Sequence, residues 1–288
     1  MNRFQFVQPH ALDEVAALLT AHGSAASVLA GGTDLLVEMR EHLRHPTLVV
    51  DIKRLPGLQR LTCDPVNGLA FGATTTAREI ECNAAVARHY PGLIHAVREL
   101  GSIQVRNRAT VIGNLCRASP SADTPPPLIA AGARVHIAGP AGAREVPLED
   151  FFTGPGRTVL APGEIVLAVR APAPAARSTS VYLKLGRRKA MELATVGVAV
   201  SLSLHADGTC AALAIVLGAV APTPIRAREA EASLIGRRPD AASIEAAAAL
   251  AMAAARPISN VRASAAYRRD MTAVLTRRAL TQATGNLA

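Results

Sequence analysis

The chain has 288 residues, of which 50% are hydrophobic, and this is enough for a sizeable core in one large domain or two modest ones. Aromatic residues make up only 3% of the sequence and the basic residues are scattered, whereas a nucleic-acid surface needs clustered basic residues with aromatic stacking partners. We therefore expect no nucleic-acid partner, and an anionic cofactor and acidic partner subunits account for the net charge of +9.

We expect no targeting segment and no membrane span. The stretch from Met1 to Leu19 contains charged side chains and lacks a continuous apolar segment, and no run approaches the roughly 20 apolar residues that a spanning helix needs. The cysteines lie far apart without a C-x-x-C pair: Cys63, Cys82, Cys116 and Cys210. These features predict a cytoplasmic protein with reduced thiols and with no metal site or iron–sulfur cluster of its own.

The first third of the chain alternates strand and helix patterns. Apolar residues at helical spacing follow acidic residues in a first turn, and short apolar runs end at proline or glycine. We predict a strand at 4–7, a helix at 11–21, a strand at 27–30, a helix at 35–43 and a strand at 48–52. This order is typical of a small α/β unit.

The middle of the chain mixes short elements with loops. We predict a strand at 69–72, helices at 77–87 and 93–100, a polar loop at 106–114, a proline-rich turn at 120–127 and regular structure at 128–138. A segment rich in proline, alanine and serine at 171–180 is typical of a linker or long turn.

In the last part of the chain, the pattern of apolar residues predicts strands followed by helices. The strands are expected at 181–185, 195–204 and 210–220, and the helices at 225–235, 241–255 and 265–281. We therefore divide the chain into a larger domain at 1–175 and a smaller α+β domain at 176–288.

A glycine pair follows the predicted strand at 27–30, in the segment Ala30-Gly31-Gly32-Thr33-Asp34. Two glycines allow backbone N–H groups to turn toward one point, the following helix adds its positive end, and Thr33 adds a hydroxyl. Such a loop can hold a diphosphate, although the same pattern also occurs in ordinary turns. It lacks the G-x-G-x-x-G spacing of a Rossmann dinucleotide site.

A second polar segment, Thr110-Val111-Ile112-Gly113-Asn114, offers hydroxyl and amide groups on either side of a glycine. These groups suit a second set of hydrogen bonds to phosphate or ribitol, or they form an ordinary surface loop. Asp123 lies beside prolines and either accepts hydrogen bonds from a ribose or caps the turn before Leu128.

Several segments in one order carry a resemblance that runs from about residue 3 to residue 280. They are Ala30–Asp34, Gln104–Asn114, Ser119–Asp123, Phe152–Gly156, Leu160–Glu164 and Pro222–Arg226. Together they resemble the flavoprotein subunit of the xanthine dehydrogenase family, which includes the medium subunit of carbon monoxide dehydrogenase. The resemblance implies an α+β fold: a two-part FAD-binding domain of the vanillyl-alcohol-oxidase/PCMH type, followed by a smaller α+β C-terminal domain.

The resemblance also implies which residues bind FAD. The pyrophosphate is expected between 28–35 and 110–114, the adenosine ribose at Asp123, and the isoalloxazine ring beside Leu100, Lys184 and Val166 or Ile165. The expected binding residues are Val28, Leu29, Ala30, Gly31, Gly32, Thr33, Asp34, Leu35, Leu100, Thr110, Val111, Ile112, Gly113, Asn114, Asp123, Val166 and Lys184. The family pattern has glycine where this chain has Ile112, so we expect strain there if the position requires a positive φ.

The family function implied is electron transfer through FAD in a molybdenum hydroxylase. The molybdenum cofactor is expected on a large subunit and two [2Fe-2S] clusters on a small subunit, in a dimer of heterotrimers. NAD is the expected acceptor, and xanthine or a related N-heterocycle the first choice of substrate. Family members that reduce aromatic acyl thioesters carry an inserted cysteine-rich segment that holds an extra [4Fe-4S] cluster. This chain continues directly from Cys116 to Ser119-Pro120 without such an insert, so we expect no extra cluster in this subunit. The alternatives are a stand-alone flavin oxidase and an assembly scaffold without flavin.

Overall fold

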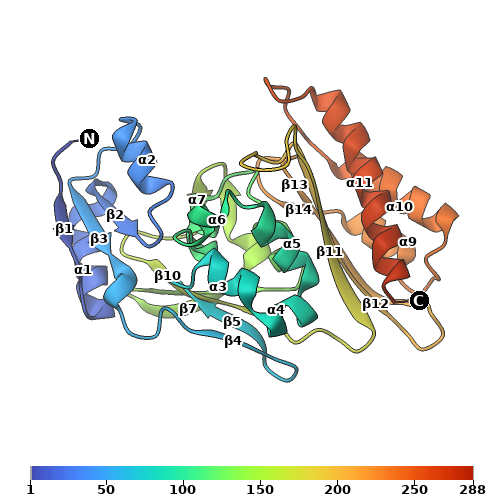
Figure 1. Cartoon of the computed structure of the whole chain (residues 1–288), viewed down its shortest axis with the longest axis horizontal. Coiled ribbons are helices and arrows are strands. Elements are labelled where there is room, and N and C mark those ends of the chain that lie inside the picture. The colour runs from blue at the N-terminus through green and yellow to red at the C-terminus, as the bar shows by residue number, and fades with distance from the viewer. Residues whose placement is uncertain (1, 288) are drawn as a thin grey trace.

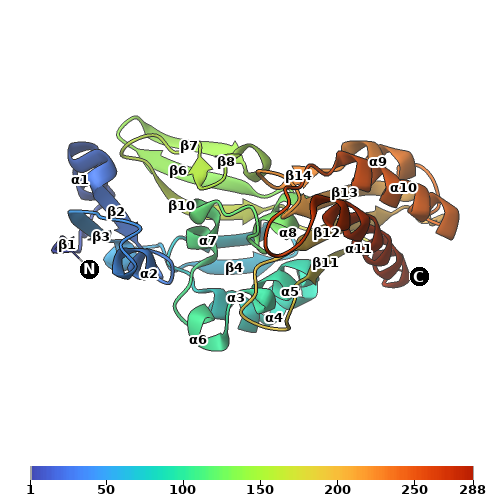
Figure 2. The ribbon, with the colours of Figure 1, turned by 90° about the horizontal axis from the view of Figure 1, so that it is seen from above.

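The computed structural model describes residues 2–287 in three parts that follow one another along the molecule (Figure 1, Figure 2). The N-terminal part is a three-stranded parallel sheet in the order β1-β3-β2 with two helices. Its elements are β1 (Gln5–Val7), α1 (Leu12–His22), β2 (Ala26–Leu29), α2 (Leu35–Arg40) and β3 (Leu48–Asp51), with 3-10 turns at Gly23–Ala25 and Ile52–Arg54. The predicted α/β unit is confirmed, element by element.

The middle part is built on a five-stranded antiparallel sheet in the order β4-β5-β10-β6-β7, with a separate two-stranded β8-β9 hairpin. Its strands are β4 (Leu61–Asp64), β5 (Gly68–Gly72), β6 (Arg134–Gly139), β7 (Gly142–Pro147), β8 (Phe152–Gly154), β9 (Arg157–Thr158) and β10 (Ile165–Ala171), with a 3-10 turn at Leu148–Asp150. Its helices are α3 (Ala77–Cys82), α4 (Ala84–His89), α5 (Pro91–Glu99), α6 (Ile103–Arg106), α7 (Val111–Arg117) and α8 (Pro125–Ala130).

Three predictions for this part are wrong. The expected loop at 106–114 contains the start of α7, because Thr110 caps that helix by accepting a hydrogen bond from the Gly113 N–H at 3.0 Å. The proline run at 125–127 begins α8, since prolines in a first turn lose no helical hydrogen bond. The expected helix at 77–87 is divided at Asn83, whose side chain caps α4.

The C-terminal part is a four-stranded antiparallel sheet in the order β11-β12-β13-β14. Its elements are β11 (Ser178–Leu185), β12 (Val196–Leu204), β13 (Cys210–Gly218), β14 (Ile225–Arg226), α9 (Arg228–Leu234), α10 (Ala241–Ala254) and α11 (Ala265–Gly285). Helices α9 to α11 cover one face of this sheet, and α5 and α8 of the middle part pack against the other face (Figure 1).

Side chains of β12 alternate between these two faces, as strand geometry requires. Val198, Val200 and Leu202 belong to the hydrophobic core under α10 and α11. The opposite face carries smaller residues such as Gly197, where a Cβ atom would lie only 2.8 Å from the Tyr182 hydroxyl oxygen. Next to Gly197 on the same face, a Cβ atom on Gly218 of β13 would lie 2.9 Å from the Cγ atom of Pro126 in α8, so the missing side chain lets the middle part approach the sheet closely.

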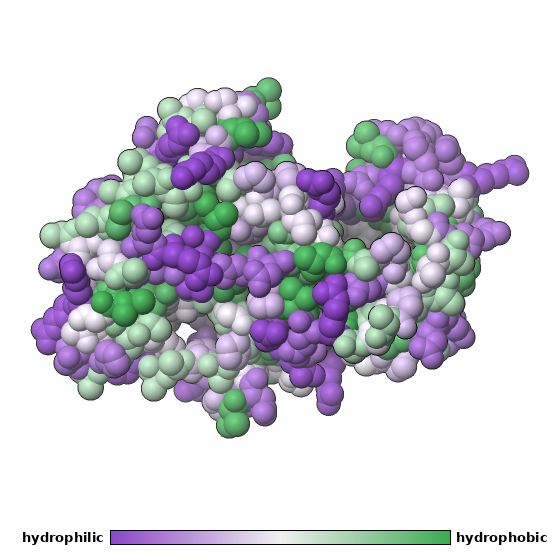
Figure 3. All heavy atoms as spheres, turned by 180° about the vertical axis from the view of Figure 1, so that it is seen from behind, coloured by the Kyte–Doolittle hydropathy of each residue, from purple (hydrophilic) through white to green (hydrophobic). Residues whose placement is uncertain are grey.

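The predicted linker at 171–180 is shorter and better anchored than expected. Strand β10 extends to Ala171 and β11 begins at Ser178, and the Tyr90 hydroxyl donates a hydrogen bond to the Pro172 carbonyl at 2.7 Å. The expected α+β class is confirmed. Among residues 2–287 no helix is both long and apolar enough to cross a membrane, and the face in Figure 3 alternates polar and apolar areas.

Candidate functional site

A cavity of about 730 Å³ lies where the three parts of the molecule meet. It is lined from all of them, by residues within 26–38, 100–105, 109–123, 160–166 and 191–193. The volume falls within the range of cofactor and ligand sites. Most of the predicted binding residues line it: Val28, Ala30, Gly31, Gly32, Thr33, Asp34, Leu35, Leu100, Thr110, Ile112, Gly113, Asn114, Asp123 and Val166. Leu29, Val111 and Lys184 lie behind this lining.

The loop between β2 and α2 forms one wall through its backbone. A Cβ atom on Gly31 would lie 2.3 Å from the Arg108 carbonyl oxygen, so only glycine allows this loop to touch the segment before α7. Gly32 has a φ of +77°, which glycine adopts without strain. Within residues 2–287 the N–H groups of Gly31, Gly32 and Thr33 donate no hydrogen bond. The loop therefore offers unused donors to an anion.

The first turn of α7 forms the neighbouring stretch of the same wall. The Thr110 hydroxyl is held as the helix cap, and a Cβ atom on Gly113 would lie 2.8 Å from that hydroxyl oxygen. The Asn114 side chain accepts a hydrogen bond from the Thr124 hydroxyl at 2.7 Å. The Thr110 hydroxyl and the Asn114 side chain, both predicted to bind a cofactor, therefore also form hydrogen bonds within the protein.

Ile112 causes no backbone strain. It lies in α7 and is not among the residues with a positive φ, and its side chain is buried in the main hydrophobic core with 3% exposed. A helical position accepts isoleucine readily, so the glycine expected there is not required by the backbone of this chain.

A buried cluster of polar side chains lies at another part of the cavity, where Asp123 is the lining residue. The two carboxylate oxygens of Asp123 accept hydrogen bonds from the Tyr182 hydroxyl at 2.8 Å and from the Lys184 ammonium at 3.0 Å. Burial raises the pKa of Asp123 to about 6, although the nearby Lys184 ammonium opposes this shift. Asp123 does not cap α8, whose N-cap residue is Thr124.

Lys184 is buried, contrary to the simplest expectation for a lysine on a strand. Its side chain is 4% exposed. Besides Asp123, its ammonium donates to the carbonyl oxygens of Glu99 at 3.3 Å and Glu192 at 2.7 Å. All three donors of the ammonium are therefore used within the protein, and they join α5, the segment before α8 and the loop after β11.

The contact between Asp123 and Lys184 bears on the expected roles of both residues. The resemblance assigns Asp123 to the adenosine ribose and Lys184 to the isoalloxazine ring, which are opposite ends of an extended FAD. A separation of 3.0 Å between the two side chains does not allow an extended cofactor to satisfy both assignments.

The cavity also contains residues that sequence reasoning missed. Glu38 on α2 pairs with Arg117 on α7 at 2.7 Å, which joins the N-terminal part to the middle part at the rim. Met191 and Leu193 line the cavity from the loop after β11 and are exposed. Burial raises the pKa of the Cys116 thiol to about 12, so this lining thiol stays protonated at neutral pH. Only the charge run at 187–189 marks this loop in the sequence.

The contact-forming glycines, the unused N–H groups and the cavity volume fit a large cofactor with a diphosphate. Comparison with known proteins identifies its class. Residues 2–174 match the family described as the FAD binding domain in molybdopterin dehydrogenase, and residues 181–283 match the CO dehydrogenase flavoprotein C-terminal domain. The chain therefore belongs to the FAD-binding subunits of the molybdenum hydroxylases, which are oxidoreductases, and FAD is its cofactor.

Individual relatives agree with this assignment over nearly the whole chain. The putative xanthine dehydrogenase FAD-binding subunit of Escherichia coli is 32% identical, over 92% of this chain and 91% of that protein. The carbon monoxide dehydrogenase medium chain of Hydrogenophaga pseudoflava is 33% identical, over 98% and 97%. A solved structure of carbon monoxide dehydrogenase from H. pseudoflava matches with a TM-score of 0.95 at 34% identity, covering 100% of this chain and 99% of that one. The expected order of an FAD-binding domain followed by a C-terminal flavoprotein domain is confirmed.

Proposed function

We propose that this chain holds FAD in the 730 Å³ cavity, with the pyrophosphate between the Ala30–Asp34 loop and the first turn of α7. The observation that carries the proposal is the contact of these two segments through Gly31. The N–H groups of Gly31, Gly32 and Thr33 point to the same conclusion, because they lack partners and can donate to phosphate oxygens.

We propose a revised arrangement for the rest of the cofactor. Asp123 faces the ribityl chain and the isoalloxazine ring, and Leu100 and Val166 supply the apolar contacts to the ring. Lys184 acts indirectly, by holding Asp123 and the Glu192 carbonyl in position. The hydrogen bonds of Lys184 to three protein acceptors support this role over a direct contact with flavin.

Bound FAD can accept electrons one at a time and release two together. We propose that electrons reach this subunit from two [2Fe-2S] clusters on a small partner subunit, which receives them from a molybdenum cofactor on a large subunit. The external acceptor is NAD, and the complex is a dimer of heterotrimers in the cytoplasm. Relatives named as medium chains and FAD-binding subunits support a multi-subunit enzyme.

Two further proposals concern the substrate and the domains. Xanthine or a related N-heterocycle is our proposed substrate of the whole enzyme, although relatives named for xanthine, carbon monoxide and nicotinate are 31–33% identical to this chain. We propose domains at 1–175 and 176–288. The family matches at 2–174 and 181–283, and the separate sheet β11-β12-β13-β14, support this division.

The test is flavin binding by the purified full chain. We expect a yellow protein, or a colourless one that gains flavin absorbance when titrated with FAD. A chain that stays colourless at saturating FAD contradicts the proposal and favours the scaffold alternative. A yellow chain that oxidises a substrate with oxygen, and that purifies from its native source without iron-containing partners, favours the stand-alone oxidase.

A further inference from the structure

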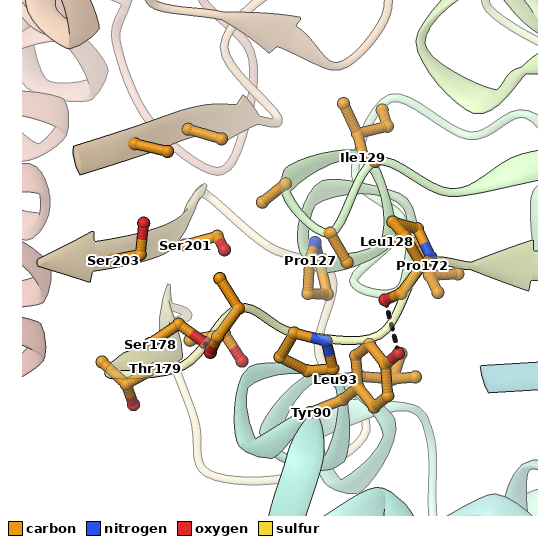
Figure 4. Close-up of a pocket in the computed structure, with 18 of the residues that line it drawn as sticks. Tyr90, Leu93, Pro127, Leu128, Ile129, Pro172, Ser178, Thr179, Ser201 and Ser203 are labelled. Carbon is orange, nitrogen blue, oxygen red and sulfur yellow. Dashed lines mark hydrogen bonds between the residues drawn. The ribbon is translucent and has the colours of Figure 1, made fainter. Parts of the chain in front are cut away.

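A second cavity, of about 320 Å³, shares no lining residue with the FAD cavity (Figure 4). Its apolar side is formed by Leu93 and by the segment 127–132 of α8 and the turn after it. The turn at 172–175 covers part of it and is fixed by the hydrogen bond from Tyr90 to the Pro172 carbonyl. The cavity is therefore bounded by anchored segments.

Hydroxyl groups from the C-terminal sheet line the facing side of this cavity. They belong to Ser178, Thr179, Ser180, Ser201 and Ser203. Ser178 donates to the Ala175 carbonyl and Ser180 accepts from the Gly92 N–H, so these two are occupied. Among the described residues, the hydroxyls of Thr179, Ser201 and Ser203 have no hydrogen-bond partner.

Ser203 is the most informative of these residues. It is only 8% exposed, yet it lines the cavity and its hydroxyl makes no hydrogen bond with residues 2–287. Its hydroxyl oxygen remains accessible to water, so it is free to form a hydrogen bond with a ligand in the cavity.

The charge of the cavity restricts the kind of ligand. Arg226 is a lining residue, but its guanidinium forms two hydrogen bonds to Glu231, at 3.0 and 2.7 Å. No aspartate or glutamate is among the lining residues that the structure describes. The polar lining therefore consists of one imidazole, that of His89, and of hydroxyls that both donate and accept, opposite proline and leucine surfaces.

We propose that this cavity is a second binding site, for a small neutral molecule that combines a flat apolar body with a hydroxyl or amide group. The apolar body packs against Leu93 and α8, and the polar group binds the hydroxyls of Ser201 and Ser203. Both walls are continuous with residues that hold Asp123 in the FAD cavity: α8 follows Asp123 in the chain, and β11 carries Ser180 as well as Lys184, which binds Asp123. Occupancy of the second site therefore acts on the elements that position Asp123.

The test uses three matched probes, phenol, benzene and sodium benzoate, added to the ¹⁵N-labelled full chain. We expect phenol to shift the backbone amide signals of 178–180 and 201–203 in a saturable manner. Benzene lacks the hydroxyl and benzoate adds a charge, so we expect each to bind at least about threefold more weakly. Binding of phenol no tighter than benzene, or shifts confined to the FAD cavity, overturns the proposal.

Variants separate the space of the cavity from its hydroxyls. Ser203→Ala keeps the space and is expected to weaken phenol binding by about threefold to tenfold. Ser203→Leu fills the cavity and is expected to abolish binding, and Ala212→Leu is a second filling variant at an exposed lining position should the first fail to fold. Ser233→Leu, on α9 outside the lining, is the control and should leave phenol binding unchanged. Unaltered binding in a folded filling variant contradicts the proposal.

Discussion

The two walls of the FAD cavity are built on opposite principles. The wall made by the Ala30–Asp34 loop and the start of α7 depends on backbone atoms and on the absence of side chains, as at Gly31. The charged wall, in which Asp123 lines the cavity with Tyr182 and Lys184 behind it, depends on charged and polar side chains that are almost fully buried. One wall offers donors to a ligand, whereas the donors of the other are already used by the protein.

This difference predicts which property, FAD affinity or folding stability, a substitution in each wall reduces most. A substitution in the backbone wall should chiefly reduce FAD affinity, because unused donors contribute little to folding. A substitution in the charged wall should chiefly reduce stability, since removing one member of a buried pair leaves the other without a partner.

The largest effect is expected for Lys184→Met. It removes the ammonium that binds Asp123 and the carbonyls of Glu99 and Glu192, and we expect the free energy of unfolding to fall by about 3–5 kcal/mol. Urea unfolding measures this loss. Lys189→Met, at an exposed position, is the matched control and should change stability by less than about 0.5 kcal/mol. An equal loss of unfolding free energy in Lys184→Met and Lys189→Met would contradict the stabilising role proposed for the charged wall.

Asp123→Asn tests the same wall through pH. Burial raises the pKa of Asp123 from 3.8 to about 6, so between these values the folded protein binds a proton that the unfolded chain has released. The stability contributed by this proton is complete below about pH 4 and is lost as the pH rises to about 6, a change on the order of 3 kcal/mol. Unfolding curves from pH 4 to 7 should show this loss in the wild type and a smaller one in Asp123→Asn. Parallel pH profiles would contradict the assignment.

In the backbone wall, Gly31→Ala is expected to weaken FAD binding at least about tenfold. The added Cβ would lie 2.3 Å from the Arg108 carbonyl oxygen, so the two phosphate-binding segments must separate, at a cost of about 1–3 kcal/mol in stability. Flavin fluorescence titration gives the affinity. Gly285→Ala is the control, because nothing lies within 4 Å of a Cβ atom there. Unchanged FAD affinity in Gly31→Ala would remove the main support for the pyrophosphate position.

Thr110→Ala should have the smallest effect on stability. Loss of the helix cap to Gly113 is expected to cost about 1 kcal/mol and to weaken FAD binding modestly, because the first turn of α7 becomes less ordered. Ser264→Ala removes a comparable cap from α11, away from the cavity, and provides the comparison. Equal loss of FAD affinity in both variants would mean that the α7 cap has no particular role.

Much of the backbone wall could be predicted from the sequence. A glycine pair between a strand and a helix is a local pattern, and both segments predicted to hold the pyrophosphate line one cavity. The sequence does not distinguish α7 from a loop, because its capping threonine and internal Gly113 also fit a polar loop. Ile112 shows the limit of comparison by motif, since its helical backbone removes the strain that a missing glycine suggested.

The charged wall could not be predicted in the same way. The resemblance implies a separate ligand contact for each of Asp123 and Lys184, whereas the two residues bind each other across 61 positions of sequence. Burial of Lys184 depends on α5 and α8 packing on the sheet face that carries Gly197. Pairing of this kind arises from tertiary packing, which local periodicity does not contain.

Strand β11 makes the enzyme intolerant of certain insertions. Val181 and Leu183 pack toward the core under α10 and α11, while Ser180, Tyr182 and Lys184 face α5 and α8. One extra residue within this strand would exchange the two faces, placing a lysine in the hydrophobic core and a leucine beside Asp123. An extra residue in the turn at 172–177 would leave the register intact. Natural variation in length should therefore collect in the turn and avoid the strand that follows it.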